Sequence, residues 1–316
     1  MGSFLLSRAV RFGGTLLGLS FLIFMLTRLI PGDPAVLMLG RGASPEAVTI
    51  LRHELGLDRP AVIQFFSWLA KMIRGDMGTS TRLDLPVSEL VFERYPRTIS
   101  FVLFGSAIAL VYALATGTLA ARKRNSWVDF LVTSVSLFGI SVPTFWLGVL
   151  LVLFMSVRLQ WLPASGYVGP TEDFGKYVKH LLMPGTALGL AVGSLMSRVV
   201  RSSLLEALNE GYVTVARAKG LSERVVMTRY ALRNALVPII TVFGIQLGYM
   251  LGGSVVIEQV FTYPGIGQLV VDAIFRRDYP LVQAAVLAYA TTFLLVNLLT
   301  DVAYAVADPR LRRAGR

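Results

Sequence analysis

The stretch that decides the fold runs from residue 98 to residue 121 and reads TISFVLFGSAIALVYALATGTLAA, without one charged side chain. A helix rises ~1.5 Å per residue, so about 20 apolar residues cross the ~30 Å hydrocarbon core of a bilayer. This run is long enough to do so. It predicts a transmembrane helix.

Five more uncharged runs lie on either side of it, at residues 12–27, 130–157, 181–197, 236–257 and 281–300. Pro143 lies near the middle of the third run and predicts a tilt or kink, whereas Pro184 and Pro238 lie near the starts of theirs. The whole chain of 316 residues is 54% hydrophobic and only 16% charged, whereas soluble domains are about 25% charged. We predict an all-α, polytopic membrane protein with six transmembrane helices and a single transmembrane domain over residues 1–316.

The first run also has features of a secretory signal, since Arg8 and Arg11 precede the apolar stretch. No small-residue cleavage site follows, because the chain continues as LIPGDP at residues 29–34. A retained signal anchor is therefore the better interpretation.

The basic residues predict the orientation. With six spans and a cytoplasmic N-terminus, the inner segments hold 16 of the 30 basic residues and 6 of the 19 acidic ones, a net of +10. The outer segments then hold 14 basic and 13 acidic residues, a net of +1. Because short cytoplasmic loops carry the excess of lysine and arginine, both termini are predicted to be cytoplasmic. The formal net charge of +11 is thus explained without a nucleic-acid partner.

Several kinds of chemistry lack their residues. There is no cysteine and no Gly-x-x-x-x-Gly-Lys-Ser/Thr phosphate loop, since Gly175-Lys176 is followed by Tyr177. The six runs contain no acidic residue and no histidine, which disfavours an ion-coupled carrier. His53 and His180 have no metal-ligand spacing. We predict no catalytic, cofactor-binding or metal-binding residue in this chain, and no enzymatic activity.

Two regions between the spans show helical periodicity. The external segment 31–97 contains an amphipathic stretch at 61–73, expected to lie on the membrane or to cap the external mouth. Smaller external loops are predicted at 158–180 and 258–280.

The cytoplasmic segment 198–235 has the pattern of two helices. Apolar residues recur at helical spacing over 202–219, Gly220 fits a C′ position, and Ser222 fits the N-cap of a second helix that runs into the fifth span. The segment carries a row of cations, at Arg217, Lys219, Arg224, Arg229 and Arg233. That row is either a face that docks into a partner's groove or the surface of a solvated connector.

Small and polar residues in the spans suggest packing and a pathway. Glycines recur every four residues at Gly185, Gly189 and Gly193, and again at Gly244, Gly248 and Gly252. Such spacing lets helices approach closely, which predicts that these two spans pack against each other or against a second subunit, either as a static contact or as a moving one. The candidates for lining a pathway are Gln246, Tyr249, Ser141 and Thr144. For the polar ones among them, hydrogen bonds between helices are the alternative.

Motifs along nearly the whole chain carry a resemblance. YVTVARAKGLS at 212–222, followed by LRNALVP at 232–238, resembles the cytoplasmic signature (the EAA loop) of ABC-importer permeases, and more narrowly that of the dipeptide, oligopeptide and nickel family. Supporting motifs are LIPGDP (29–34), LGLDRP (55–60), GDMG (75–78), VPTFWLG (142–148), YPGIG (263–267), RDYP (277–280) and DPR (308–310). The broad signature begins Glu-Ala-Ala, where this chain has Thr214, Val215 and Ala216. Without this glutamate, any salt bridge that it would make to an ATPase subunit is lost.

The resemblance implies the ABC type I importer permease fold and a set of partners. These would be a second, homologous permease in a heterodimer, two cytoplasmic ATPase subunits that bind ATP and magnesium, and an extracytoplasmic solute-binding protein, all at a bacterial inner membrane. The coupling residues would be Ala216, Arg217, Ala218, Lys219, Gly220, Leu221, Ser222 and Arg224. Dipeptides, oligopeptides, glutathione-like molecules, opines, nickel chelates and sugars all remain open as substrates. A self-sufficient channel or carrier, and a membrane-embedded enzyme, are the alternatives.

Overall fold

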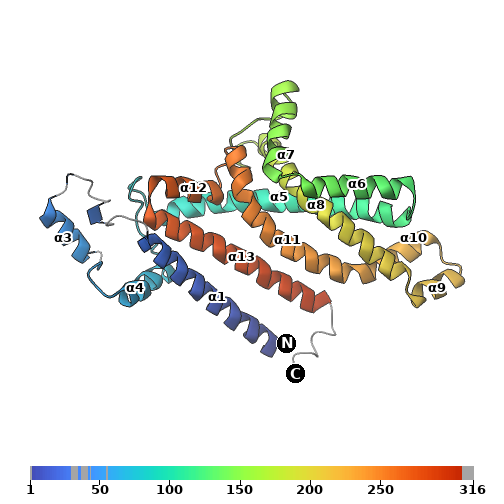
Figure 1. Cartoon of the computed structure of the whole chain (residues 1–316), viewed down its shortest axis with the longest axis horizontal. Coiled ribbons are helices and arrows are strands. Elements are labelled where there is room, and N and C mark those ends of the chain that lie inside the picture. The colour runs from blue at the N-terminus through green and yellow to red at the C-terminus, as the bar shows by residue number, and fades with distance from the viewer. Residues whose placement is uncertain (1, 30–34, 37–41, 43, 55, 308–316) are drawn as a thin grey trace. The chain divides into compact units, whose positions relative to one another are not determined.

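A computed structural model of the chain describes residues 2–29, 35–36, 42, 44–54 and 56–307, and in these ranges it contains helices, turns and one isolated β-bridge between Thr79 and Pro86. The motifs at residues 30–34 and 308–310, and Leu55, lie outside the described residues. The helices are α1 (Gly2–Leu29), α3 (Pro45–Glu54), α4 (Ala61–Ile73), α5 (Val87–Arg122), α6 (Trp127–Ser141), α7 (Thr144–Leu151), the π-helical η1 (Val152–Arg158), α8 (Phe174–Leu208), α9 (Gly211–Ala218), α10 (Glu223–Val225), the π-helical η2 (Val226–Ala231), α11 (Leu232–Val260), α12 (Ile266–Arg276) and α13 (Tyr279–Ala307). Figure 1 shows them along the chain.

Five segments of the described chain are long and apolar enough to cross a membrane: Ser7–Leu26, Val87–Arg122, Phe174–Leu208, Glu223–Val260 and Tyr279–Val302. A broken pair of helices, Trp127–Ser141 with Thr144–Arg158, makes a sixth if it is counted as one span. The all-α prediction is therefore confirmed with five to six spans, although most helices extend beyond the uncharged runs. α8, for example, begins at Phe174 because the Asp173 side chain accepts a hydrogen bond from the Lys176 amide at 2.9 Å.

The third span is broken rather than merely tilted. α6 ends at Ser141, and α7 with η1 leaves it at a bend of 100° (Figure 1). Val142 and Pro143 at the break have extended backbone angles, because the proline disfavours a helical conformation in the residue before it. Pro143 therefore has a larger effect than the kink that the sequence predicts.

The helices form two compact units. The first comprises Pro96–Gln268 together with the described parts of 1–5 and 295–316, and the second comprises Leu6–Tyr95 and Leu269–Leu294. The prediction of a single permease domain over 1–316 stays a prediction.

In the first unit α8 is the central helix, in contact with α6, α7 and α11. One face of α8 is buried along most of its length, through residues such as Leu188, Met196, Val200 and Leu204. A helix with so much of its surface inside protein packs mainly against other helices of its own chain. α8 therefore organises this unit.

In the second unit α4 confirms the amphipathic helix predicted at 61–73. Phe65 on α4 is buried and makes edge contacts with Phe21 and Phe24 of α1, at centroid distances of 5.4 and 5.6 Å. Ile63 and Phe66 on its other side are exposed. Exposed apolar side chains are tolerated where lipid surrounds them, so α4 is anchored to α1 by one face and leaves the other face available to lipid.

Candidate functional site

The two short helices α9 and α10 are joined by a tight turn at Gly220. Gly220 has φ +74°, a left-handed conformation that glycine adopts without strain. Its amide donates to the Arg217 carbonyl at 2.9 Å, and the Leu221 amide donates to the Ala216 carbonyl at 3.3 Å. These bonds close the end of α9 in the way that a C′ glycine does. The turn is where the sequence predicts it.

Ser222 begins the second helix with extended backbone angles, and its carbonyl accepts from the amides of Val225 and Val226. Its side chain makes no capping hydrogen bond, so the residue has the predicted position without the predicted hydroxyl contact. From Glu223 the chain remains helical through η2 and α11 to Val260. The second helix therefore continues into the fifth span, as expected.

The helix pair has a small core of its own. Val213 and Ala216 on α9 and Val226 on η2 are buried, and Leu208, Leu221 and Tyr230 pack against them. The packing holds α9, the turn and the start of the second helix together as one element, which we call the α9–α10 element (residues 211–231).

Its outer surface combines charge with apolar groups. Arg217 donates to both carboxylate oxygens of Glu223, at 2.7 and 3.3 Å, and this bond raises the pKa of Arg217. Lys219 and Arg224 are exposed, and so are Ala218, Gly220 and Ser222. Val215 on the same helix is 55% exposed. A surface with cations around apolar side chains suits a protein partner.

One prediction for this region was wrong. The apolar spacing over 202–219 suggested one helix, but α8 runs on to Leu208 and α9 starts only at Gly211. Glu210 between them is extended, at φ −72° and ψ 146°. Leu204 is fully buried as part of α8. The apolar residues therefore belong to two helices, and their helical spacing continues across the break between the helices by coincidence.

An ion pair between Arg201 and Asp129 connects α8 to the start of α6. Nε and Nη2 of Arg201 donate to the two oxygens of Asp129 at 2.6 and 2.7 Å, and the Asn125 amide adds a bond of 3.0 Å. Asp129 is 5% exposed. A buried carboxylate is tolerated when it is paired and hydrogen-bonded in this way. The pair fixes the start of α6 on α8.

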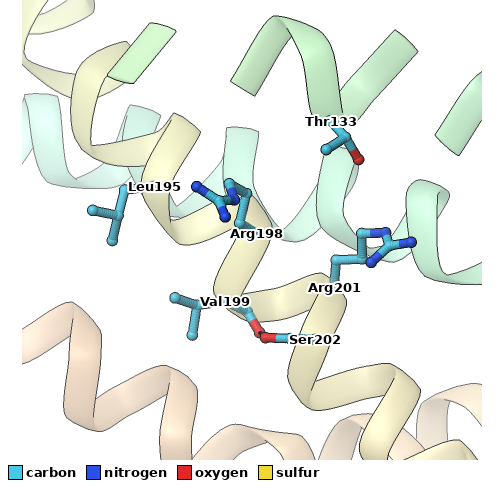
Figure 2. A pocket seen from close by; sticks show the side chains of 6 residues that line it. All are labelled: Thr133, Leu195, Arg198, Val199, Arg201 and Ser202. Carbon is cyan, nitrogen blue, oxygen red and sulfur yellow. Dashed lines mark hydrogen bonds between the residues drawn. The ribbon is translucent and has the colours of Figure 1, made fainter. Parts of the chain in front are cut away.

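Beside this pair lies a cavity of about 440 Å³ (Figure 2). Arg198, Val199 and Ser202 of α8 line it, with Thr133 of α6 on the other side. Arg198 is exposed, and no ion pair to it is found among the described residues. The cavity therefore contains one cation without an ion pair among the described residues, and two hydroxyl groups that already donate to Val199 and Asp129.

The first glycine series packs on α5 rather than on the fifth span. A Cβ at Gly185 would lie 2.5 Å from the Phe104 ring, and one at Gly189 would lie 2.6 Å from the Gly105 carbonyl oxygen. At Gly193 the nearest neighbour is the Tyr112 ring, at 3.0 Å. All three glycines therefore allow a close crossing of α5 and α8.

The second series does not form one packed stripe. A side chain at Gly244 would collide with Thr300 of α13, Gly248 is buried, and Gly252 faces open space. α8 and α11 do touch, since a Cβ at Gly253 would lie 3.4 Å from Leu188. This contact between the two spans lies beside Gly252, at a glycine outside both series.

The four candidates for a pathway lie in two parts of the chain, at the break between α6 and α7 and along α11. Ser141 and Thr144 flank the break between α6 and α7, and Ser141 is exposed with its hydroxyl donating to the Leu137 carbonyl at 2.9 Å. Tyr249 on α11 is 69% exposed and Gln246 is half-buried. Their role stays a prediction.

Sequence reasoning missed a buried carboxylate at the end of α11. Glu258 is 0% exposed. It accepts hydrogen bonds from the Thr98 hydroxyl and from the Gln268 amide, both at 2.8 Å, and Thr98 in turn accepts one from the Ile266 amide at 2.8 Å. The loop at Gly265 and Gly267 has no room for a side chain beside this carboxylate. The YPGIG motif next to an acidic residue was the signal that could have revealed it.

Comparison with known families identifies the chain. Residues 113–313 match the binding-protein-dependent transport system inner membrane component, and residues 1–102 match the N-terminal part of the same kind of membrane component. The chain belongs to this family. It is therefore a permease component of a binding-protein-dependent transporter, in an inner membrane that it crosses several times.

Relatives of this permease cover its whole length. It is 43% identical to a putative peptide transport system permease protein of Brucella abortus, over 99% of both chains. It is 40% identical to a glutathione transport system permease protein of Salmonella paratyphi A, again over 99% of both. In fold it resembles a chain of the inward-facing MetNI methionine ABC transporter, with a TM-score of 0.60 at 18% identity, covering 71% of this chain and 98% of that one.

Proposed function

We propose that this permease forms half of the pathway of an ATP-driven importer and that the α9–α10 element couples it to an ATPase subunit. The observation that carries the proposal is the element itself, which is packed, turns tightly at Gly220 and is exposed on a mixed basic and apolar face. The coupling residues are those of the turn and its flanks: Ala216, Arg217, Ala218, Lys219, Gly220, Leu221, Ser222 and Arg224. Movement of an ATPase would then be passed along the continuous helix from Glu223 into α11.

The proposed assembly contains a second permease, two ATPase subunits that hold ATP and magnesium, and an external solute-binding protein. The family's dependence on a binding protein supports the last of these. The absence of a phosphate loop in this sequence is consistent with hydrolysis in separate subunits, so the permease itself is not expected to be an enzyme. For the substrate, the peptide and glutathione transport permeases among its relatives favour short peptides and similar solutes.

Both termini are proposed to be cytoplasmic, which requires the broken third span to cross the membrane. Two contacts support a crossing. At one end Asp129 of α6 is bonded to Arg201, on the basic inner part of α8. At the other end the loop after η1 returns beside the far end of α11, where the Gly166 amide donates to the Phe261 carbonyl at 3.2 Å.

The pathway is proposed to pass the break between α6 and α7, where Ser141 and Thr144 lie. Gln246 and Tyr249 of α11 are the other proposed lining residues. A helix end at membrane depth requires polar surroundings, which supports this location.

The coupling proposal is tested at Gly220 by two substitutions. A Cβ at this position would meet nothing within 4 Å, so any effect comes from the backbone angle and not from a collision. Valine is strained in the left-handed region by about 1–2 kcal/mol, whereas asparagine adopts it more readily. We expect Gly220→Val to reduce substrate-stimulated ATP hydrolysis and uptake together by roughly tenfold, and Gly220→Asn to have a small effect.

The assay uses the complete reconstituted complex with its binding protein, and the control is Gly211→Val. Gly211 also faces open space, and its φ is an ordinary one. Wild-type uptake and ATPase stimulation in Gly220→Val would contradict the coupling role. Solute flux through this chain alone, without partners, would favour a self-sufficient channel instead.

A further inference from the structure

A second cavity, of about 460 Å³, lies behind the α9–α10 element, and of the residues that line it the coupling proposal uses Arg217 alone. The turn between α5 and α6 forms one side, with Arg122, Lys123 and Arg124. The inner ends of α8 and η2 form the floor, through Leu208 and Met227 among others. The cavity therefore joins a charged rim to an apolar floor.

The rim carries an excess of positive charge. Of its four cations, Arg217 is neutralised by Glu223, which also lines the cavity. Arg122, Lys123 and Arg124 are exposed, and no ion pair to any of them is found within the part of the chain that the structure describes. Three adjacent cations without a partner attract a phosphate or another anion.

The position of the cavity relative to the membrane indicates the source of that anion. Arg122 is the last residue of a membrane-spanning helix. Trp127, just beyond the turn, is 72% exposed and stacks on the exposed Phe130 at a centroid distance of 5.3 Å. Exposed tryptophan is typical of the level of the lipid headgroups. Leu119, one turn before Lys123, is 45% exposed and offers an apolar surface below the rim.

We propose that this cavity binds the phosphodiester headgroup of an anionic phospholipid of the inner leaflet. Arg122, Lys123 and Arg124 contact the phosphate, and the acyl chains lie against the exposed apolar side of α5. Basic pockets at the cytoplasmic ends of membrane helices bind such headgroups in other proteins. Because Arg217 and Glu223 belong to both the cavity and the α9–α10 element, the lipid would support that element from the membrane side.

The test is native mass spectrometry of the full chain in detergent, with phosphatidylglycerol or phosphatidylcholine of the same acyl chains added. We expect the wild type to bind phosphatidylglycerol at clearly lower concentration. Each cation near an anionic headgroup contributes about fivefold in affinity, so Lys123→Gln with Arg124→Gln should weaken binding about twenty-five-fold. The charge-preserving pair Lys123→Arg with Arg124→Lys should restore it.

The matched control is Arg229→Gln with Arg233→Gln, which removes the same charge from exposed residues outside the cavity. It should leave the preference for phosphatidylglycerol intact. Equal binding of both lipids by the wild type, or equal loss in the two double variants, would overturn the proposal. So would displacement of the lipid by inorganic phosphate at lipid-like concentrations. No ATPase is present, so this outcome is independent of the coupling proposal.

Discussion

Replacing Gly189 by alanine would place a methyl group 2.6 Å from the carbonyl oxygen of Gly105 and 3.0 Å from Ile108. Ordinary contacts begin near 3.4 Å, so the shortfall to the backbone oxygen is roughly 0.8 Å, from 3.4 minus 2.6. A carbonyl in the middle of α5 cannot swing away as a side chain can. The two helices would have to separate.

The expected cost follows from two opposing effects. Overpacking a tight contact costs about 1–3 kcal/mol, while alanine is favoured over glycine in a helix by up to ~1 kcal/mol. Gly189→Ala should therefore destabilise the permease by a net of about 1–2 kcal/mol. Gly252→Ala adds the same methyl group where nothing lies within 4 Å, so only the favourable effect remains and the change in stability should have the opposite sign.

The assay is thermal unfolding of the purified chain in detergent, followed by the fluorescence of its 4 tryptophans. For a chain of this size the expected decrease in Tm for Gly189→Ala is a few degrees. Gly193→Ala, with its nearest contact at 3.0 Å, should fall between the other two variants. Equal Tm values for Gly189→Ala and Gly252→Ala would refute the argument that α5 and α8 depend on this close contact.

Three further predictions concern the paired and buried groups. Asp129→Asn should lower the stability by about 3 kcal/mol, because Arg201 loses its bidentate partner. Adding Arg201→Met should recover part of the loss in the same unfolding assay. A larger loss in the double variant would contradict the role of the ion pair. Glu258→Ala should speed hydrogen exchange at the amides of Ile266 and Gln268, because Thr98 and Gln268 both lose their acceptor; unchanged exchange there would show that the loop does not need the carboxylate. Phe65→Ala should cost about 3–4 kcal/mol and make α4 sensitive to protease, whereas Phe66→Ala, at an exposed position, serves as its control and should not.

The spans and the turn at Gly220 could be predicted from the sequence because each rests on local physics. An uncharged run of about 20 residues has few alternatives to crossing a bilayer, and the position after Lys219 favours a residue that tolerates positive φ. The amphipathic helix 61–73 is local in the same sense, since its apolar periodicity lies between Pro60 and Gly75 in the sequence.

What depends on partners distant in the sequence could not be predicted. The glycines of α8 face Gly105 and its neighbours on α5, but spacing alone cannot say which helix a small-residue face will meet. Glu258 looks like an ordinary loop residue until Thr98, 160 positions away, is brought beside it. The boundary at Asn209 was missed because apolar residues continue across it, although the chain turns there.

The break in the third span has a consequence for hydration. At ~1.5 Å per residue, the 15 residues of α6 cover only about 22 Å of the ~30 Å hydrocarbon thickness, so the helix ends inside the membrane. Most carbonyl groups of its last turn have no partner within the helix, and Ser141 and Pro143 at that end are exposed. In a purely hydrocarbon environment, each of these unpaired carbonyl groups would cost several kcal/mol. Polar groups, from water or from a neighbouring protein chain, are therefore needed around this bend.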